Sequence, residues 1–216
     1  MDLRKKLAII AGVYVIEGFP MGIFRDLWPV YFRDHGVSLA VIGAVSGLYL
    51  AWSVKLLWSP LIDRFGERRQ WIAGALCAMA ASLLLLPGLD LGEIDRLFWM
   101  VLIFLCVGSA TQDIAIDAYT IGIVELGEEG PANSVRIIAY RIGLIAAGGG
   151  LLLLPNQIGW TATFGVAAAL MVLMATGVFA CPRVEVPPES RRDVRGAFRS
   201  WQVRGGVVLV LCFVLL

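Results

Sequence analysis

The hydrophobic positions of this chain fall into long, almost uncharged runs separated by short polar connections. A helix rises about 1.5 Å per residue, so about 20 apolar residues span a bilayer core of about 30 Å. Six runs reach that length, and we predict one membrane-spanning helix over each of them. They cover roughly residues 7–31, 39–61, 71–89, 97–124, 132–154 and 160–181.

The last part of the chain consists of a charged segment followed by a short apolar one. Residues 182–204 contain Pro187-Pro188 and a dense mixture of charges, which is typical of a solvated linker. Another apolar run begins near residue 205 and continues to residue 216, which is too short to span a bilayer. We therefore expect a six-helix unit over residues 1–181, a cytoplasmic linker over 182–204 and a seventh helix that starts at 205 and is truncated.

Composition supports a membrane protein. Hydrophobic residues make up 59% of the chain and charged residues 16%, whereas soluble domains average roughly 45–50% and 25%. The net charge of +1 combines almost uncharged apolar segments with charged connections, so it says nothing about partners, and we expect no nucleic-acid partner. The four cysteines lie in or at the end of apolar runs without CxxC spacing, so we expect no metal site, no cofactor and no disulfide framework.

The basic residues predict the orientation, because lysine and arginine in short connections stay on the cytoplasmic side. Twelve of them lie in the N-terminal tail, the second connection and the sixth connection. The connections on the other side offer only Arg33 and Arg96 clearly outside a helix. We therefore expect the N-terminus in the cytoplasm.

Ionisable residues inside the apolar runs are the main candidates for function, since each costs at least about 2.5–3.5 kcal/mol to insert into a membrane. Glu17 lies about ten residues into the first run and therefore near the midplane. Gly18 and Pro20 interrupt the helix just after it, and such an interruption is tolerated where the backbone finds partners or lines a cavity. Glu17 is thus a candidate for a proton or substrate contact, the alternative being a carboxylate that serves packing alone.

The fourth run contains the most polar segment, with Gln112, Asp113 and Asp117. A spacing of four residues places both aspartates on one helix face, where two ionised carboxylates repel each other. One of them must then be protonated, or a cation must lie between them.

The fifth run supplies arginines at matching depths. Arg136 is expected beside Asp117, with Tyr140 on its own face, and Arg141 is expected beside Asp113. Such pairs serve as structural ion pairs, as a gate or as a proton path, and the sequence leaves these roles open. Arg141 is the first candidate for binding an anionic solute, because a guanidinium binds carboxylate or phosphate at two points.

The exit of the second run reads KLLWSPLIDRFGERRQW from Lys55 to Trp71. It resembles the signature loop between helices 2 and 3 of the major facilitator superfamily, with Ser59 in place of the usual glycine. The resemblance implies that this loop braces two halves of a transporter on the cytoplasmic side. The residues concerned are Asp63, Arg64, Gly66, Arg68 and Arg69. Lys55 begins the motif and is expected to extend along the helix to the cytoplasmic surface.

Two further segments point to one branch of that superfamily. SATQDIAIDAYTI, residues 109–121, and the shorter AYRIG, residues 139–143, are similar to elements of helices 4 and 5 in AmpG-type muropeptide permeases and acetyl-coenzyme A transporters. The resemblance implies the N-terminal six-helix half of a major facilitator fold, with the C-terminal half missing. It further implies proton-coupled import of a bulky anionic solute across a bacterial inner membrane, a muropeptide first and acetyl-coenzyme A second.

Two other classes compete with this interpretation. A membrane-embedded prenyltransferase-like enzyme also uses aspartates spaced by four, but it needs a second acidic motif on the same membrane side to bind metal, and the sequence offers none. His35, the single histidine, lies in a connection and forms no nucleophile-base arrangement, so we expect no enzyme. A membrane sensor or scaffold has no need for costly charges on three helices.

Overall fold

The computed structural model describes residues 1–92 and 94–184, apart from the side chains of Ala51 and Asp63. The described chain forms helices and their connections and contains no strand. Most of the predicted linker and the whole of the predicted seventh helix lie outside the described residues.

Each of the six predicted spans is helical. The first comprises α1 (Leu3–Gly22), the π-helix η1 (Ile23–Leu27) and α2 (Trp28–Asp34). The second comprises α3 (Leu39–Ser46), η2 (Gly47–Tyr49), α4 (Leu50–Val54), η3 (Lys55–Leu57) and α5 (Ser59–Arg64). The others are α6 (Arg68–Leu85) with η4 (Leu86–Gly88), α7 (Arg96–Ile123), α8 (Glu129–Ile145) with η5 (Ala146–Gly150), and α9 (Pro155–Val178).

Five of these described spans are long and apolar enough to cross a membrane, judged by length and composition. The fifth span, formed by α8 and η5, is not among the five, and it carries Arg136 and Arg141. An all-helical membrane fold is therefore confirmed.

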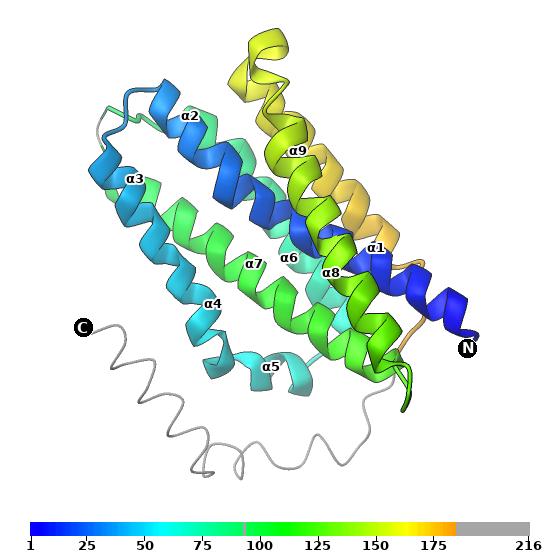
Figure 1. Ribbon diagram of the computed structural model, residues 1–216. Coiled ribbons are helices and arrows are strands. Elements are labelled where there is room, and N and C mark those ends of the chain that lie inside the picture. The colour runs from blue at the N-terminus through cyan, green and yellow to red at the C-terminus, as the bar shows by residue number, and fades with distance from the viewer. Residues whose placement is uncertain (93, 185–216) are drawn as a thin grey trace.

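The helices pack in two groups, α1 with α8 and α6 with α9, and α7 contacts both groups. The most extensive contact joins α1 to α8, and α6 packs against both α7 and α9. Figure 1 shows the spans running in alternating directions, with the N-terminus and the α7–α8 connection at one end of the molecule and the α2–α3 and α8–α9 connections at the other. Large buried aromatic side chains fill the core, among them Trp28, Phe32, Phe98 and Phe164.

The contact between α1 and α8 depends on glycine. A Cβ atom at Gly18 would overlap the backbone oxygen of Tyr140, and one at Gly143 would overlap the backbone oxygen of Val15. Pro20 lies inside α1, and the chain continues as a helix through the wider turn of η1. The expected interruption after Glu17 is therefore a local widening of the helix.

Candidate functional site

The two aspartates of α7 share one face, as their spacing predicts, and a cation lies between them. The ammonium group of Lys55, at the start of η3, pairs with Asp113 and lies 4.0 Å from the Oδ2 atom of Asp117. All three side chains are partly buried.

Asp117 has two further partners. Arg136 of α8 approaches its Oδ1 atom to 2.7 Å, and the hydroxyl of Tyr14 donates a hydrogen bond of 2.8 Å to the same oxygen. The guanidinium of Arg136 also lies 4.8 Å from the centre of the Tyr14 ring, within range of a cation–π contact. The pairing of Asp117 with Arg136 agrees with their predicted depths.

Two expectations about this network are wrong. Asp113 pairs with Lys55 rather than with Arg141, and Lys55 turns into the network instead of extending to the membrane surface. The physical reason is that η3 lies directly against α7, so the lysine meets a carboxylate before it reaches water. The side chain of Arg141 is exposed and makes no ion pair within the described part of the chain.

Glu17 and Gln112 are buried beside this network, where α1 meets α7. The amide nitrogen of Gln112 donates a hydrogen bond of 3.0 Å to the backbone oxygen of Ile16. Among the described residues, neither Oε2 of Glu17 nor Oε1 of Gln112 has a hydrogen-bond partner. Unpartnered buried oxygens are rare and costly, which sets these two groups apart.

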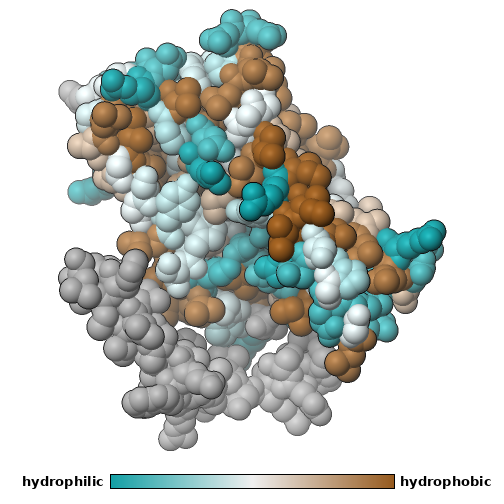
Figure 2. Space-filling view, in the orientation of Figure 1, coloured by the Kyte–Doolittle hydropathy of each residue, from teal (hydrophilic) through white to brown (hydrophobic). Residues whose placement is uncertain are grey.

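A cavity of about 540 Å³ opens between α1 and α8. Its polar lining consists of Tyr14, Glu17, Arg25, Arg136, Tyr140 and Arg141. Figure 2 shows hydrophilic residues near the middle of the face formed by α7 and α8, among apolar ones. The structure thus brings Glu17, Tyr140 and Arg141 to one cavity, with the aspartate network beside it.

Sequence reasoning missed Arg25. It follows Tyr14 by eleven residues, three helical turns along the same face, and both side chains line the cavity. Its nearest carboxylate belongs to the adjacent Asp26, with the Nε and Oδ1 atoms 3.6 Å apart. Arg25 is a charged residue inside the first apolar run, and this feature of the sequence could have marked it as a candidate.

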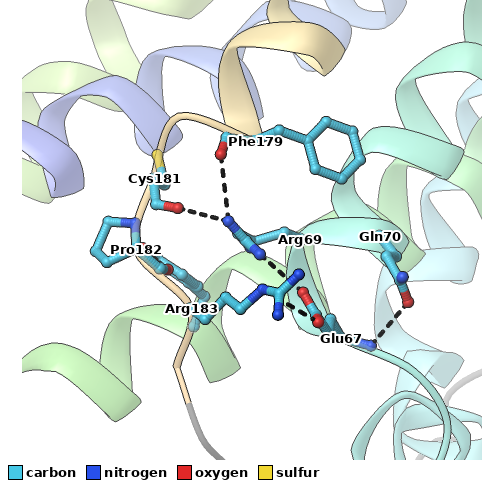
Figure 3. Close-up of polar contacts among 8 residues, drawn as sticks. Glu67, Arg69, Gln70, Phe179, Cys181, Pro182 and Arg183 are labelled. Carbon is cyan, nitrogen blue, oxygen red and sulfur yellow. Dashed lines mark hydrogen bonds and ion pairs between the residues drawn. The ribbon is translucent and has the colours of Figure 1, made fainter.

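The start of α6 and the residue before it are joined to the segment that follows α9 (Figure 3). Arg69 donates hydrogen bonds to the backbone oxygens of Phe179 at 3.2 Å and Cys181 at 2.7 Å, and to Glu67 at 2.9 Å. Arg183 also approaches Glu67, with 3.4 Å between its Nε atom and Oε1. The hydrogen bond from Arg69 holds the pKa of Glu67 below its usual range. We call this set, Glu67, Arg69, Phe179, Cys181 and Arg183, the terminal clasp.

The other residues of the loop motif are placed differently. Gly66 has a φ of 72°, a left-handed conformation that suits glycine. The guanidinium of Arg64 lies 5.6 Å from the ring centre of Phe65. Arg68 lies in the first turn of α6, and the side chain of Asp63 is outside the described residues. Bracing of a second half by this motif stays a prediction.

A second link at the same end was not predicted. Lys6 of α1 is buried, and its ammonium group lies 2.6 Å from Glu125 and 2.7 Å from Glu128, in the connection before α8. The hydrogen bond from Lys6 lowers the pKa of Glu128. The acidic fourth connection, which runs against the charge pattern of its side, thus neutralises a lysine of the first helix.

The sequence profile of the Major Facilitator Superfamily matches residues 10–216. The chain belongs to this superfamily. It is 29% identical to the anhydromuropeptide permease of Escherichia coli K12 over 99% of its own length and 45% of the permease. It is 34% identical to an uncharacterized protein of Haemophilus influenzae, over 81% of this chain and 42% of that protein. It is 30% identical to the protein of Rickettsia conorii named "Putative transporter AmpG 4", over 80% of this chain and 44% of that protein.

The resemblance to AmpG-type permeases is therefore confirmed, and the chain spans less than half the length of these relatives. Together with the apolar helices, the superfamily makes this a multi-pass integral membrane protein. The superfamily match and the name of the Escherichia coli relative indicate a transporter rather than an enzyme, against the prenyltransferase-like alternative.

Proposed function

We propose that the chain is the N-terminal half of a permease that imports a bulky anionic solute, coupled to protons, across a bacterial inner membrane. A muropeptide is the proposed solute. The N-terminus, the loop before α6 and the end of α9 lie at one end of the molecule, and their arginines and lysines favour a cytoplasmic location for that end.

The observation that carries this proposal is the cavity between α1 and α8. Arg25 and Arg141 line it, and neither pairs with a carboxylate of another described element. A guanidinium binds a carboxylate or phosphate through two parallel hydrogen bonds, so an anionic solute fits these side chains. A volume of about 540 Å³ admits a solute much larger than a single sugar or amino acid.

The charge network beside the cavity supports coupled transport. Charges at bilayer depth are costly and mark ion and proton pathways. Lys55, Arg136 and the two aspartates join three spans, so a change of protonation at one of them alters contacts between helices. The name of the Escherichia coli relative supports a muropeptide as the solute.

Uptake by the full-length protein in lipid vesicles tests the proposal. We expect labelled anhydromuropeptide to accumulate when a proton gradient is imposed and to equilibrate without one. Arg141→Gln is expected to raise KM by about tenfold to a hundredfold, the equivalent of one lost charged hydrogen bond. Arg33→Gln, which alters an exposed arginine outside the cavity, is the matched control.

Three results would contradict the proposal. Uptake no greater than in empty vesicles excludes the solute, and uptake of acetyl-coenzyme A in its place reassigns it. Accumulation that is the same with and without the proton gradient excludes proton coupling.

A further inference from the structure

The contacts between α1 and α8 give the depth of the arginines that line the cavity. A Cβ atom at Gly18 would overlap the backbone of Tyr140, and one at Gly22 would overlap the backbone of Gly148. The order of these contacts shows that the two helices run in the same direction through the bundle. Arg141 follows Tyr140 in α8, so it lies at the depth of Gly18.

Arg25 lies further along the bundle. It comes seven residues after Gly18, which separates the two by about 10 Å at a rise of about 1.5 Å per residue. Its Nε atom lies 3.6 Å from Asp26, whose carboxylate lies against the backbone of Gly148. Helical side chains lean toward the N-terminus of their own helix, so Arg141 leans away from Arg25. The two arginines therefore offer two separate points for binding an anion.

Both guanidinium groups are open to a solute. The side chain of Arg25 is 61% exposed, and its closest approach to Asp26 is longer than a hydrogen bond. Arg141 is also exposed, whereas Arg136 of the same cavity is already paired within the aspartate network. The acid of the cavity, Glu17, is only 9% exposed, so an anion that enters meets the arginines first.

The cavity wall between the two arginines is uncharged, because Leu144 and Ile145 line it there. We propose that the cavity binds one solute with two anionic groups about 10 Å apart, one on Arg25 and one on Arg141, and with an uncharged stretch between them. This assignment rests on the proposed function of the chain as half of an anion permease. It narrows the solute class to molecules that carry two separated carboxylates or phosphates.

A short extended peptide supplies this spacing. Its backbone advances about 3.3–3.6 Å per residue, so acidic groups three positions apart are separated by about 10 Å. A muropeptide whose peptide carries two such carboxylates fits both arginines at once, whereas a solute with a single carboxylate binds only one of them.

Analogues of the solute test the assignment in the full-length protein in lipid vesicles. The probes are an anhydromuropeptide with two peptide carboxylates and two analogues, each with a different one of these carboxylates converted to an amide. With the unmodified probe, Arg25→Gln and Arg141→Gln should each raise the dissociation constant and KM by about tenfold to a hundredfold. Each analogue should be insensitive to one variant and fully sensitive to the other, and the two analogues should show opposite patterns.

Two further variants separate binding from a general effect on the protein. Arg33→Gln alters an exposed arginine outside the cavity and should change the binding of none of the three probes. Arg25→Lys keeps the charge but loses the two-point geometry of the guanidinium, so its loss of affinity should lie between those of the wild type and Arg25→Gln.

Two results would overturn the assignment. If the same analogue is insensitive to both glutamine variants, the two arginines bind one anionic group. If both variants weaken all three probes equally, only the total charge of the cavity matters.

Binding and uptake are measured separately, so the outcomes distinguish this assignment from the permease proposal. A wild type that accumulates the unmodified probe while the variants fail the expected pattern overturns the two-anion assignment alone. A wild type that binds the probes in the expected pattern and does not accumulate them supports the assignment and contradicts the permease proposal.

Discussion

At the residue scale, Lys55 serves two carboxylates of α7 at once. It pairs with Asp113 and lies 4.0 Å from Asp117, and its side chain is 23% exposed. Removal of such a cation leaves Asp113 partly buried without a partner, which costs more than the pair contributes.

Lys55→Gln is therefore expected to lower the stability of the full-length protein by about 1–3 kcal/mol, measured as the unfolding temperature in detergent. The double variant Lys55→Gln with Asp113→Asn should be less destabilised than the sum of the two single variants, because both charges are gone. Lys5→Gln, an exposed position on α1, should have no effect. Additive losses would show that the two side chains do not interact.

The contacts of these residues could be predicted from the sequence only in part. The spacing of Asp113 and Asp117 and the depth of Arg136 follow from helix geometry, and the structure pairs Asp117 with Arg136. The partner of Asp113 could not be predicted in this way. Helix geometry gives the position of a residue along its own helix, but it does not say which neighbouring helix lies against that residue. Lys55 reaches α7 because the second span lies against that helix.

At the element scale, α1 and α8 touch through their backbones. Gly18 faces the backbone oxygen of Tyr140, and Gly143 faces that of Val15, with no space for a methyl group at either position. Small residues that let helices approach closely are typical of packing inside membranes, where lipid offers no hydrophobic driving force.

Gly18→Ala should therefore separate α1 from α8 and destabilise the protein by about 1–3 kcal/mol, the usual cost of overpacking. Because Glu17 and Tyr140 line the cavity at this contact, uptake should fall as well. Gly12→Ala is a control on the same helix, since a Cβ there meets nothing within 4 Å and alanine favours the helix. Equal unfolding temperatures for the two variants would show that the contact is loose.

The elements themselves were predictable from hydrophobic length, but their irregularities were not. All six runs are helical, yet the second is divided among α3, η2, α4, η3 and α5. Pro60 explains the break before α5, because proline suits the first turn of a new helix. The π-turns η1 and η5 lie against each other, a tertiary contact that a run of apolar residues does not encode.

At the scale of the whole molecule, one end of the bundle is held by two polar links. Lys6 joins α1 to the connection before α8 through Glu125 and Glu128. The terminal clasp joins the start of α6 to the segment after α9, and the hydroxyl of Tyr119 adds a hydrogen bond of 3.0 Å to the backbone oxygen of Pro182. Together these contacts tie five of the six spans, namely those of α1, α6, α7, α8 and α9. The permease of Escherichia coli is more than twice as long as this chain.

Arg69 is the centre of the terminal clasp, because it binds the backbone oxygens of Phe179 and Cys181, just after α9, as well as Glu67. Arg69→Gln should lower the stability of the full-length protein by about 1.5–3 kcal/mol at neutral pH, the range for hydrogen bonds to a charged group. Proteolysis after Cys181 should become faster. Arg4→Gln, an exposed arginine at the same end, is the control.

Glu67→Gln isolates the charge of the terminal clasp, because glutamine can still accept the hydrogen bond from the backbone of Gln70 that begins α6. The pKa of Glu67 is lowered in the folded protein, so the stabilisation is complete at neutral pH and is lost as the pH falls below about 4. The unfolding temperature of Glu67→Gln should thus lie slightly below that of the wild type at pH 7 and should equal it in acid. A constant difference at every pH would mean that the Glu67 side chain acts through its shape alone, and that Arg69 holds the end of α9 without it.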